Sequence, residues 1–210
     1  MTEDEARAWL SAQFDVPRET WDRLERYVTS LLDEMTRQNL IAESTRDHVW
    51  ARHIVDSAQL LLLGGREMSA PWIDLGSGAG LPGIVIAVLS GWSVLMVESR
   101  RKRIDFLNRV IDDLDLNARV FGGRVEMLRD VPPGAVISGR AFAPLPKLFA
   151  TSAHLSDAQT LWLLPKGKNW QNELESTRQA WQGAFHVERS ITDPDSAIIV
   201  ARTVTRRGRT

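Results

Sequence analysis

The sequence predicts an α/β protein with a seven-stranded, mostly parallel sheet and a helical N-terminal extension. From residue 72 onward, short β-prone runs alternate with helical segments, the pattern of a doubly wound parallel sheet. Before residue 70, only helical periodicity is present. Between the last two strand candidates lies only a short segment around Thr192–Asp195, which is too short for a crossover helix. We therefore expect the last strand to pair antiparallel.

Two helices are expected in the extension. Apolar residues recur at three- and four-residue steps over residues 18–38, which indicates one buried stripe. A second helix is expected over 45–63, where Val49, His53, Asp56 and Leu60 share a face. We assign residues 1–68 to the extension and 69–210 to the core, and expect both to form one compact structural domain.

The core is expected to alternate strands and helices in order. Helical patterns cover residues 82–90 and 100–114, and further helical segments separate several of the later strands. The strand candidates are residues 72–75, 93–98, 118–121, 134–138, 159–164, 184–190 and 197–203.

Composition excludes several classes of protein. The 210 residues include no cysteine, which excludes disulfides, thiolate metal sites and a cysteine nucleophile. The acidic start, Met1–Glu5, lacks the basic segment of a secretory signal. The longest apolar stretch, near Ile84–Leu89, is far short of the roughly 20 residues that span a bilayer. We expect a cytoplasmic protein without a membrane partner.

Charge is unevenly distributed although the net charge is only −1. Acidic residues dominate up to residue 72, and basic residues dominate after it. The basic residues gather at Arg100–Arg103 and at Arg202, Arg206, Arg207 and Arg209. Such clusters are either solvated surface or a face for nucleic acid.

The strongest signal is the glycine-rich segment Asp74–Gly83 between a strand and a helix. A dinucleotide loop would need glycine where Leu81 stands, and a phosphate loop would need lysine where Ile84 stands. The spacing D-x-G-x-G-x-G, from Asp74 to Gly80, instead matches a loop for S-adenosyl-L-methionine. We expect Gly76 and Gly78 to approach this cofactor closely, because glycine lets the backbone do so.

Glu98 ends the second strand, where an acidic side chain can accept hydrogen bonds from ribose hydroxyls. This feature also occurs in nicotinamide enzymes, so the loop spacing decides between the two cofactors.

The continuation Leu81-Pro82-Gly83 makes the loop more specific. With it, the chain resembles the ribosomal RNA small-subunit methyltransferase G family. Further segments match that family in order, and the resemblance covers roughly residues 20–205. These segments are Asn39-Leu40-Ile41, Trp50-x-Arg52-His53-Ile54-x-Asp56-Ser57, Arg124-Val125-Glu126, Ser138-Gly139-Arg140-Ala141-Phe142-Ala143 and Leu164-Pro165-Lys166-Gly167.

The resemblance implies a Rossmann-like enzyme that methylates N7 of one guanine in the 530 loop of bacterial 16S rRNA. It implies cofactor contacts from Gly76 and Leu81, from Val125 and Glu126 beside the adenine, and from Arg140 near the methionine end. The implied partner is 16S rRNA or a small-subunit assembly intermediate. With no long heptad repeat in the sequence, we expect a monomer.

The residues present agree with chemistry at N7. This nitrogen carries a free lone pair at neutral pH, so no general base is required. A cysteine nucleophile for pyrimidine C5 is missing, and no Asn/Asp-Pro-Pro-aromatic motif for exocyclic amines follows the fourth strand. The four histidines lack metal-ligand spacing, so no metal site is expected.

Arg140 is the candidate for a role beyond binding. It could hold the cofactor carboxylate or guanine O6, or it could form an ion pair with Glu126 or Glu98. Lys166 and Lys168 could contact phosphate or lie in a solvated loop. For Arg52, His53 and Asp56, we favour a polar contact between helix and sheet.

Other functions stay open at this point. A methyltransferase acting on a protein or small molecule shares the cofactor loop, and so does a protein that binds the cofactor or RNA without catalysis. A nicotinamide oxidoreductase is disfavoured by Leu81.

Overall fold

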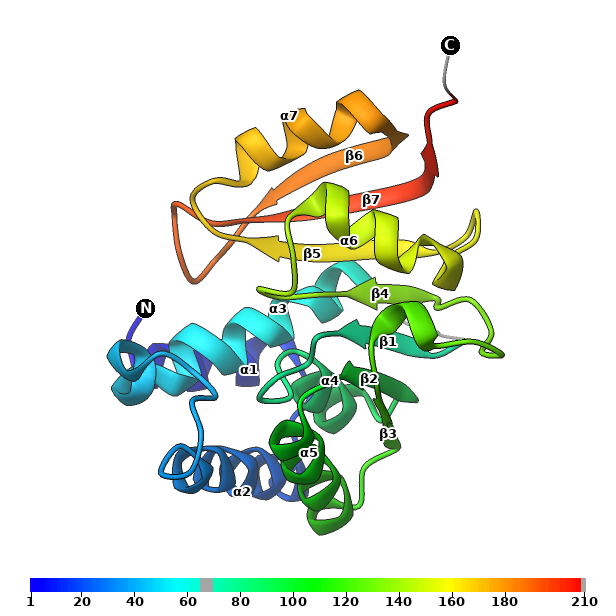
Figure 1. Ribbon diagram of the computed structural model, residues 1–210. Helices are drawn as coiled ribbons and strands as arrows, with labels where there is room; N and C mark the ends of the chain where they lie inside the picture. Colours follow the sequence, from blue (N-terminus) through cyan, green and yellow to red (C-terminus); the bar gives the residue numbers. More distant parts are fainter. Residues whose placement is uncertain (65–69, 209–210) are drawn as a thin grey trace.

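The computed structural model describes residues 1–64 and 70–208. Its centre is a seven-stranded sheet with the order β3-β2-β1-β4-β5-β7-β6 (Figure 1). Strands β1 to β5 run parallel, and β7 is antiparallel to both β5 and β6. This confirms the predicted sheet. The strands are β1 (Trp72–Leu75), β2 (Val94–Glu98), β3 (Ala118–Gly122), β4 (Val136–Ser138), β5 (Leu161–Lys166), β6 (Trp181–Arg189) and β7 (Ala197–Arg206).

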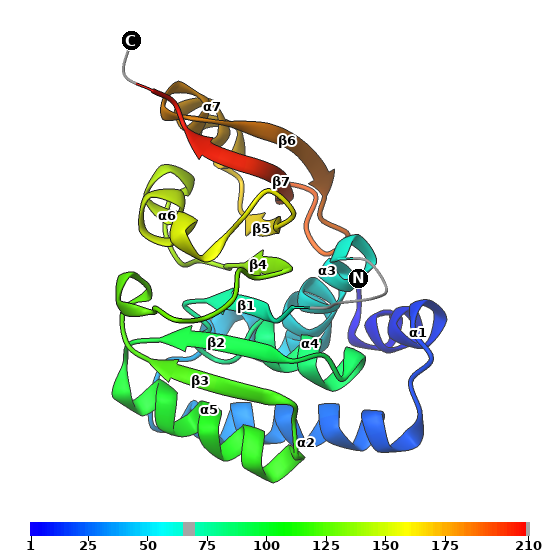
Figure 2. The same ribbon diagram turned by 90° about the vertical axis from the view of Figure 1, so that its right-hand side faces the viewer.

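Helices cover both faces of the sheet (Figure 2). Helices α4 (Gly83–Ser90) and α5 (Arg101–Leu114) lie on one face. On the other face lie α6 (Leu145–Ser152) and α7 (Trp170–Ala180), with the short turns η3 (Val125–Met127) and η4 (Ala153–Leu155). Each face has its own apolar cluster.

The N-terminal third consists of α1 (Glu3–Gln13), α2 (Arg18–Glu34), η1 (Glu43–His48), η2 (Trp50–Ile54) and α3 (Val55–Gly64). The predicted second helix is present, but it begins as a 3-10 turn and a π-helical turn. Helix α1 was not predicted, although Thr2 and Glu5 form a capping box at its start. The proposed boundary at residues 68 and 69 lies outside the described residues.

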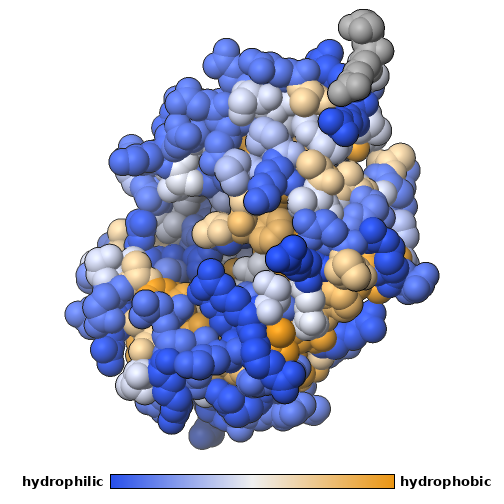
Figure 3. All heavy atoms as spheres, in the orientation of Figure 1, coloured by the Kyte–Doolittle hydropathy of each residue, from blue (hydrophilic) through white to orange (hydrophobic). Residues whose placement is uncertain are grey.

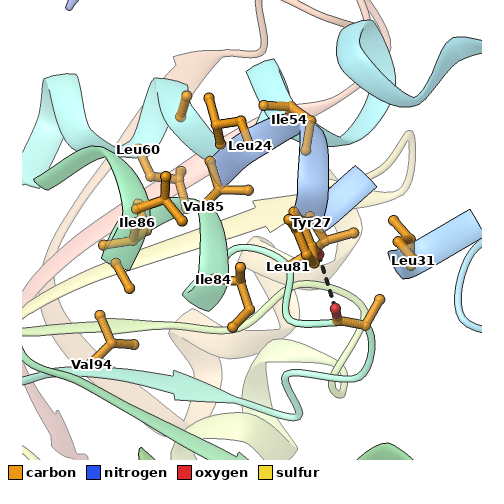
Figure 4. Close-up of a cluster of buried hydrophobic side chains, with 14 of the residues drawn as sticks. Leu24, Tyr27, Leu31, Ile54, Leu60, Leu81, Ile84, Val85, Ile86 and Val94 are labelled. Carbon is orange, nitrogen blue, oxygen red and sulfur yellow. Dashed lines mark hydrogen bonds between the residues drawn. The ribbon is translucent and has the colours of Figure 1, made fainter. Parts of the chain in front are cut away.

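The extension packs on α4 and α5, and Figure 4 shows its contact with α4. Leu24 and Leu31 of α2 lie in the same buried cluster as Ile84 and Val85 of α4, all without solvent exposure (Figure 4). The side chains of α4 are buried on nearly every side. The extension is therefore the outer layer that completes the core on this face. None of the helices in the described ranges is long and apolar enough to cross a membrane.

Candidate cofactor and acceptor site

The glycine loop joins β1 to α4 at the carboxyl end of the sheet. Gly76, Gly78 and Gly80 have φ values of +65°, +57° and +93°, a region that side chains other than glycine rarely adopt. A Cβ atom on Gly76 would lie 2.5 Å from Cδ2 of Phe142. Glycine at position 76 is therefore required both by the turn and by the close approach of the segment after β4.

Asp74, on β1, holds this loop through hydrogen bonds of its carboxylate. Its carboxylate is fully buried and accepts hydrogen bonds from Ser138 Oγ at 2.7 Å and from the Gly83 N–H at 3.3 Å. Burial raises the pKa of Asp74, and the hydrogen bond from Ser138 opposes this effect. The side chain thus connects β1, β4 and the start of α4.

Glu98 connects the end of β2 to the same loop. One carboxylate oxygen accepts from the Gly78 N–H at 3.0 Å, and the other accepts from the N–H groups of Ser99 and Arg100 at 2.7 and 2.9 Å. The residue is 5% exposed. A carboxylate offers about four acceptor positions, so one remains for a ligand.

A cavity of about 470 Å³ lies in front of the loop, and we call it the loop cavity. Four predicted cofactor residues line it together: Gly76, Glu98, Val125 and Glu126. The structure does not place the other three in its wall. The Gly78 N–H donates to the Glu98 carboxylate, and Leu81 is buried in the core.

Arg140 lines a second cavity of about 670 Å³, which we call the adjoining cavity. The two cavities share the wall Ala141–Ala143. Figure 3 shows the surface hollowed on the left, between the part built on β5–β7 and the N-terminal helices. The volumes of both cavities are typical of small-molecule sites.

Arg140 does not form the ion pair considered from the sequence. Its Nη1 lies 3.2 Å from Asp56 Oδ2 and 3.1 Å from His53 Nδ1, not against Glu126 or Glu98. Asp56 stands 84 positions earlier, on α3. This alternative was wrong because it considered only partners from the sheet, whereas the extension brings α3 to the end of β4.

His53 is held as a neutral ring. Burial is the main cause that lowers its pKa, and together with the positive charges of Arg140 and Arg52 it brings the pKa to about 3. The neutral ring accepts from Arg140 at Nδ1, so Nε2–H donates to Thr45 Oγ1 at 2.7 Å. The favoured contact between helix and sheet is confirmed for His53 and Asp56. Arg52 instead bonds to Thr192 O and Asp193 in the loop between β6 and β7.

Lys166 is buried at the end of β5. Its Nζ donates to the Ala143 carbonyl at 2.6 Å and lies 2.9 Å from Glu173 Oε2. The same Glu173 oxygen accepts from the Leu145 N–H at 3.1 Å. Lys166 thus lines the adjoining cavity in an ion pair, whereas Lys168 is exposed.

Three residues of the site were missed in the sequence. Phe142 was quoted only within a motif, and nothing local marks Glu173 as the partner of Lys166. Tyr27 belongs to the apolar stripe of α2, but its hydroxyl donates to the Ala79 carbonyl of the glycine loop at 2.9 Å (Figure 4). Burial raises its pKa, so the hydroxyl stays protonated.

Basic side chains stand around the loop cavity. Arg100, Arg103, Arg124 and Lys147 line it. Of the predicted cluster Arg100–Arg103, two members contact acidic groups: Arg101 pairs with Asp105 at 3.0 Å, and Arg103 lies 3.8 Å from Glu98. Arg209 of the C-terminal cluster lies outside the described residues.

A glycine loop of this spacing after β1, a carboxylate at the end of β2 and an antiparallel β7 define the class of S-adenosyl-L-methionine-dependent methyltransferases. Solved structures share the fold. A SAM-dependent methyltransferase from Aquifex aeolicus superposes with a TM-score of 0.58 at 12% identity, covering 82% of this chain and 96% of that one. A glycopeptide N-methyltransferase solved with S-adenosylmethionine gives 0.56 at 11% identity, covering 71% and 93%.

The sequence comparisons identify the family within this class. The profile described as "rRNA small subunit methyltransferase G" matches residues 20–197, and the chain belongs to this family. Ribosomal RNA small subunit methyltransferase G of Rhizorhabdus wittichii is 52% identical, covering 100% of this chain and 96% of the relative. The protein of the same name from Zymomonas mobilis is 48% identical, covering 96% and 94%.

Proposed function

We propose that this protein transfers a methyl group from S-adenosyl-L-methionine to N7 of a guanine in the 530 loop of 16S rRNA. One observation carries the proposal beyond family membership. Two cavities of the size of small-molecule sites meet at the wall Ala141–Ala143. Methyl transfer between two bound molecules needs such neighbouring sites, because donor and acceptor must be held in contact.

The loop cavity fits the cofactor. Gly76, Gly78 and Leu81 belong to the loop, Glu98 offers an acceptor for a ribose hydroxyl, and Val125 and Glu126 also line the cavity. Arg140 stands behind the shared wall, where it faces the second cavity. When bound, the cofactor supplies a methyl group on a positively charged sulfur. Carboxylates such as Glu98 and Glu126 are compatible with that charge.

The protein's own contribution is orientation and the exclusion of water. N7 of guanine has a lone pair at neutral pH, so no side chain has to remove a proton. His53 agrees with this, because its lowered pKa and its bonds to Arg140 and Thr45 leave it in a supporting position. Phe142, which lines both cavities, supplies apolar surface where the two molecules would meet.

We further propose that the protein is a cytoplasmic monomer and that its substrate is 16S rRNA or a small-subunit assembly intermediate. The four basic residues around the loop cavity support an RNA substrate, because phosphate contacts provide most of the affinity for nucleic acid.

The product allows a direct test, because N7-methylguanine in RNA can be reduced and the chain then cleaved at that position. The 16S rRNA from cells with and without the gene is mapped in this way. We expect one cleavage in the 530 loop to vanish on deletion, and to return when purified protein and S-adenosyl-L-methionine are added. An unchanged pattern would remove the rRNA assignment and favour a protein or small-molecule acceptor. Cofactor binding without turnover on any acceptor would favour a non-catalytic binding protein.

A further inference from the structure

The adjoining cavity contains an ion pair with unused hydrogen-bonding capacity. Lys166 and Glu173 both line it. An ammonium group has three donors, of which Lys166 uses one on the Ala143 carbonyl and directs at most one more at Glu173 Oε2, its partner in the ion pair. Glu173 Oε2 accepts from Lys166 and from the Leu145 N–H, whereas Oε1 has no partner within the described ranges. The pair therefore offers one donor beside one acceptor.

This arrangement is complementary to one edge of guanine. Guanine presents O6, an acceptor, directly beside N1–H, a donor. Adenine presents the reverse at the same positions, with an amino donor beside the acceptor N1. A donor from Lys166 and an acceptor from Glu173 therefore favour guanine and oppose adenine. Bases held in protein pockets are read in this way, through hydrogen bonds to their Watson–Crick edge.

The position of the pair also fits the reacting atom. On the purine ring, N7 is on the side of O6 that faces away from N1. Lys166 is bonded to Ala143, which belongs to the wall shared with the loop cavity. Guanine bound with O6 at Lys166 and N1 at Glu173 would have N7 on the Lys166 side of the pair, and Lys166 is the member bonded to this wall.

The two other ion pairs that line the cavity, Arg140–Asp56 and Arg52–Asp193, are less suited to this task. The Asp56 carboxylate already accepts from Arg140, Gln59 and Thr192 Oγ1. The Asp193 carboxylate already accepts from Arg52, Ser196 Oγ and the Asp195 N–H. These bonds, led by that of Asp195, lower its pKa and fix it within its own loop. Because three bonds occupy each of these carboxylates, they have less capacity for a base than Glu173.

Resting on the proposed function, we propose that Lys166 and Glu173 are the specificity residues for the acceptor base, with Lys166 donating to O6 and Glu173 accepting from N1–H. Both side chains touch the substrate in this proposal. Neither is a general base.

The test replaces the acceptor guanine, in 16S rRNA assembled into small subunits, by inosine or by 2-aminopurine. Inosine keeps O6 and N1–H but lacks the 2-amino group. 2-Aminopurine keeps the 2-amino group and N7 but lacks O6 and N1–H. For the wild-type enzyme we expect inosine to react within about tenfold of guanine and 2-aminopurine to react at least about 100-fold more slowly, as in sites built around hydrogen bonds.

The variants Lys166→Met and Glu173→Gln then separate recognition from loop support. We expect both to lower the preference for guanine over 2-aminopurine to under about tenfold. Glu173→Gln should improve the reaction of 2-aminopurine in absolute terms, because the new amide can donate to its N1. Lys168→Met, two residues after Lys166 and exposed, serves as the control and should leave the preference unchanged.

The outcomes are distinguishable. If guanine and the analogues react but the two variants keep the wild-type preference, the pair only supports the loop and the inference is overturned. Rejection of inosine by the wild type would also overturn it, since the 2-amino group would then be what is read. If the wild type does not methylate the guanine substrate at all, the proposed function itself fails and this inference fails with it.

Discussion

Arg140 is the residue at which the extension and the sheet meet the adjoining cavity. Asp56 and His53 bind its guanidinium and hold it in one orientation. In this orientation Arg140 lines the adjoining cavity. Such a fixed cation stabilises negative charge more effectively than a mobile one. The residue can therefore position a substrate or cofactor group without reorganisation.

We predict that Arg140→Ala lowers the rate of methyl transfer at least about tenfold, because a fixed charge that lines the proposed acceptor site is lost. The fold should survive, since Asp56 still accepts hydrogen bonds from Gln59 and Thr192. Initial rates on small subunits and thermal unfolding measure the two effects. Arg140→Lys keeps the charge and should retain more activity than alanine. Wild-type turnover in the alanine variant would exclude the role.

His53 predicts how stability depends on pH. Its pKa is 6.5 in the unfolded chain and about 3 in the folded protein. As the pH falls below 6.5, the unfolded chain binds a proton that the folded protein does not bind. The free energy of unfolding therefore decreases as the pH falls through this range, by up to about 2 kcal/mol at pH 5.

Urea unfolding of the wild type and of His53→Gln at pH 7 and pH 5 measures this contribution. Glutamine can accept from Arg140 and donate to Thr45, but it does not titrate. We expect the variant to lose less free energy of unfolding between the two pH values. Equal losses in both proteins would show that His53 does not stay neutral in the fold.

At the scale of elements, α2 and the glycine loop are joined through the Tyr27 hydroxyl. Tyr27→Phe would leave the Ala79 carbonyl without this partner, which costs about 1 kcal/mol of unfolding free energy. Because the bond also holds the loop, we expect cofactor affinity to fall by up to about fivefold. Calorimetric titration with S-adenosylhomocysteine measures this change in affinity.

Ser90→Ala is the matched control for Tyr27. It removes a hydroxyl bond to the Ile86 carbonyl in α4, at the end away from the loop. The control should lose stability but keep cofactor affinity. If both variants bind equally well, α2 does not organise the loop.

At the turn after β1, we expect a substitution of Gly76 to lower both stability and cofactor affinity. Gly76→Ala combines a φ of +65° with a Cβ position 2.5 Å from the Phe142 ring. We expect a stability loss of about 1–2 kcal/mol and at least about tenfold weaker cofactor binding, because Phe142 must move within the shared wall. Gly91→Ala separates the two causes, since Gly91 has a φ of +68° and no atom within 4 Å of the added Cβ. The Gly91→Ala variant should lose only the stability that the positive φ costs, and its cofactor affinity should be unchanged.

Periodicity and turn chemistry sufficed to predict the strands and most helices, because these depend on local patterns. The loop between β1 and α4 was equally readable, since its glycines are required by local backbone geometry. Contacts between distant elements were not readable. Asp56 contacts Arg140 only because α3 packs at the end of β4. In the sequence, Tyr27 looks like one more apolar residue of the α2 stripe, and nothing local indicates its bond to Ala79. Glu173 likewise becomes part of the site through its position on α7.

At the scale of the whole molecule, the extension and the sheet share one apolar cluster. Leu10, Leu24 and Ile54 of the extension have no solvent exposure, and neither have Val85 and Ile86 of α4. Without the extension, α4 would expose an apolar surface that cannot remain in water at low cost. The glycine loop, the adjoining cavity and the extension are therefore expected to be stable together or not at all.

We accordingly predict that residues 1–64 unfold in the same transition as the sheet. Native-state hydrogen exchange measures this, since amides that open only in global unfolding share one free energy. The slowest amides of α2 and of β5 should give equal values. Amides of the edge strand β6, whose side chains are mostly exposed, should exchange at lower free energy and serve as the internal reference. A distinctly lower value for α2 would make the extension an independent unit, and Tyr27 and Asp56 would then organise the site only part of the time.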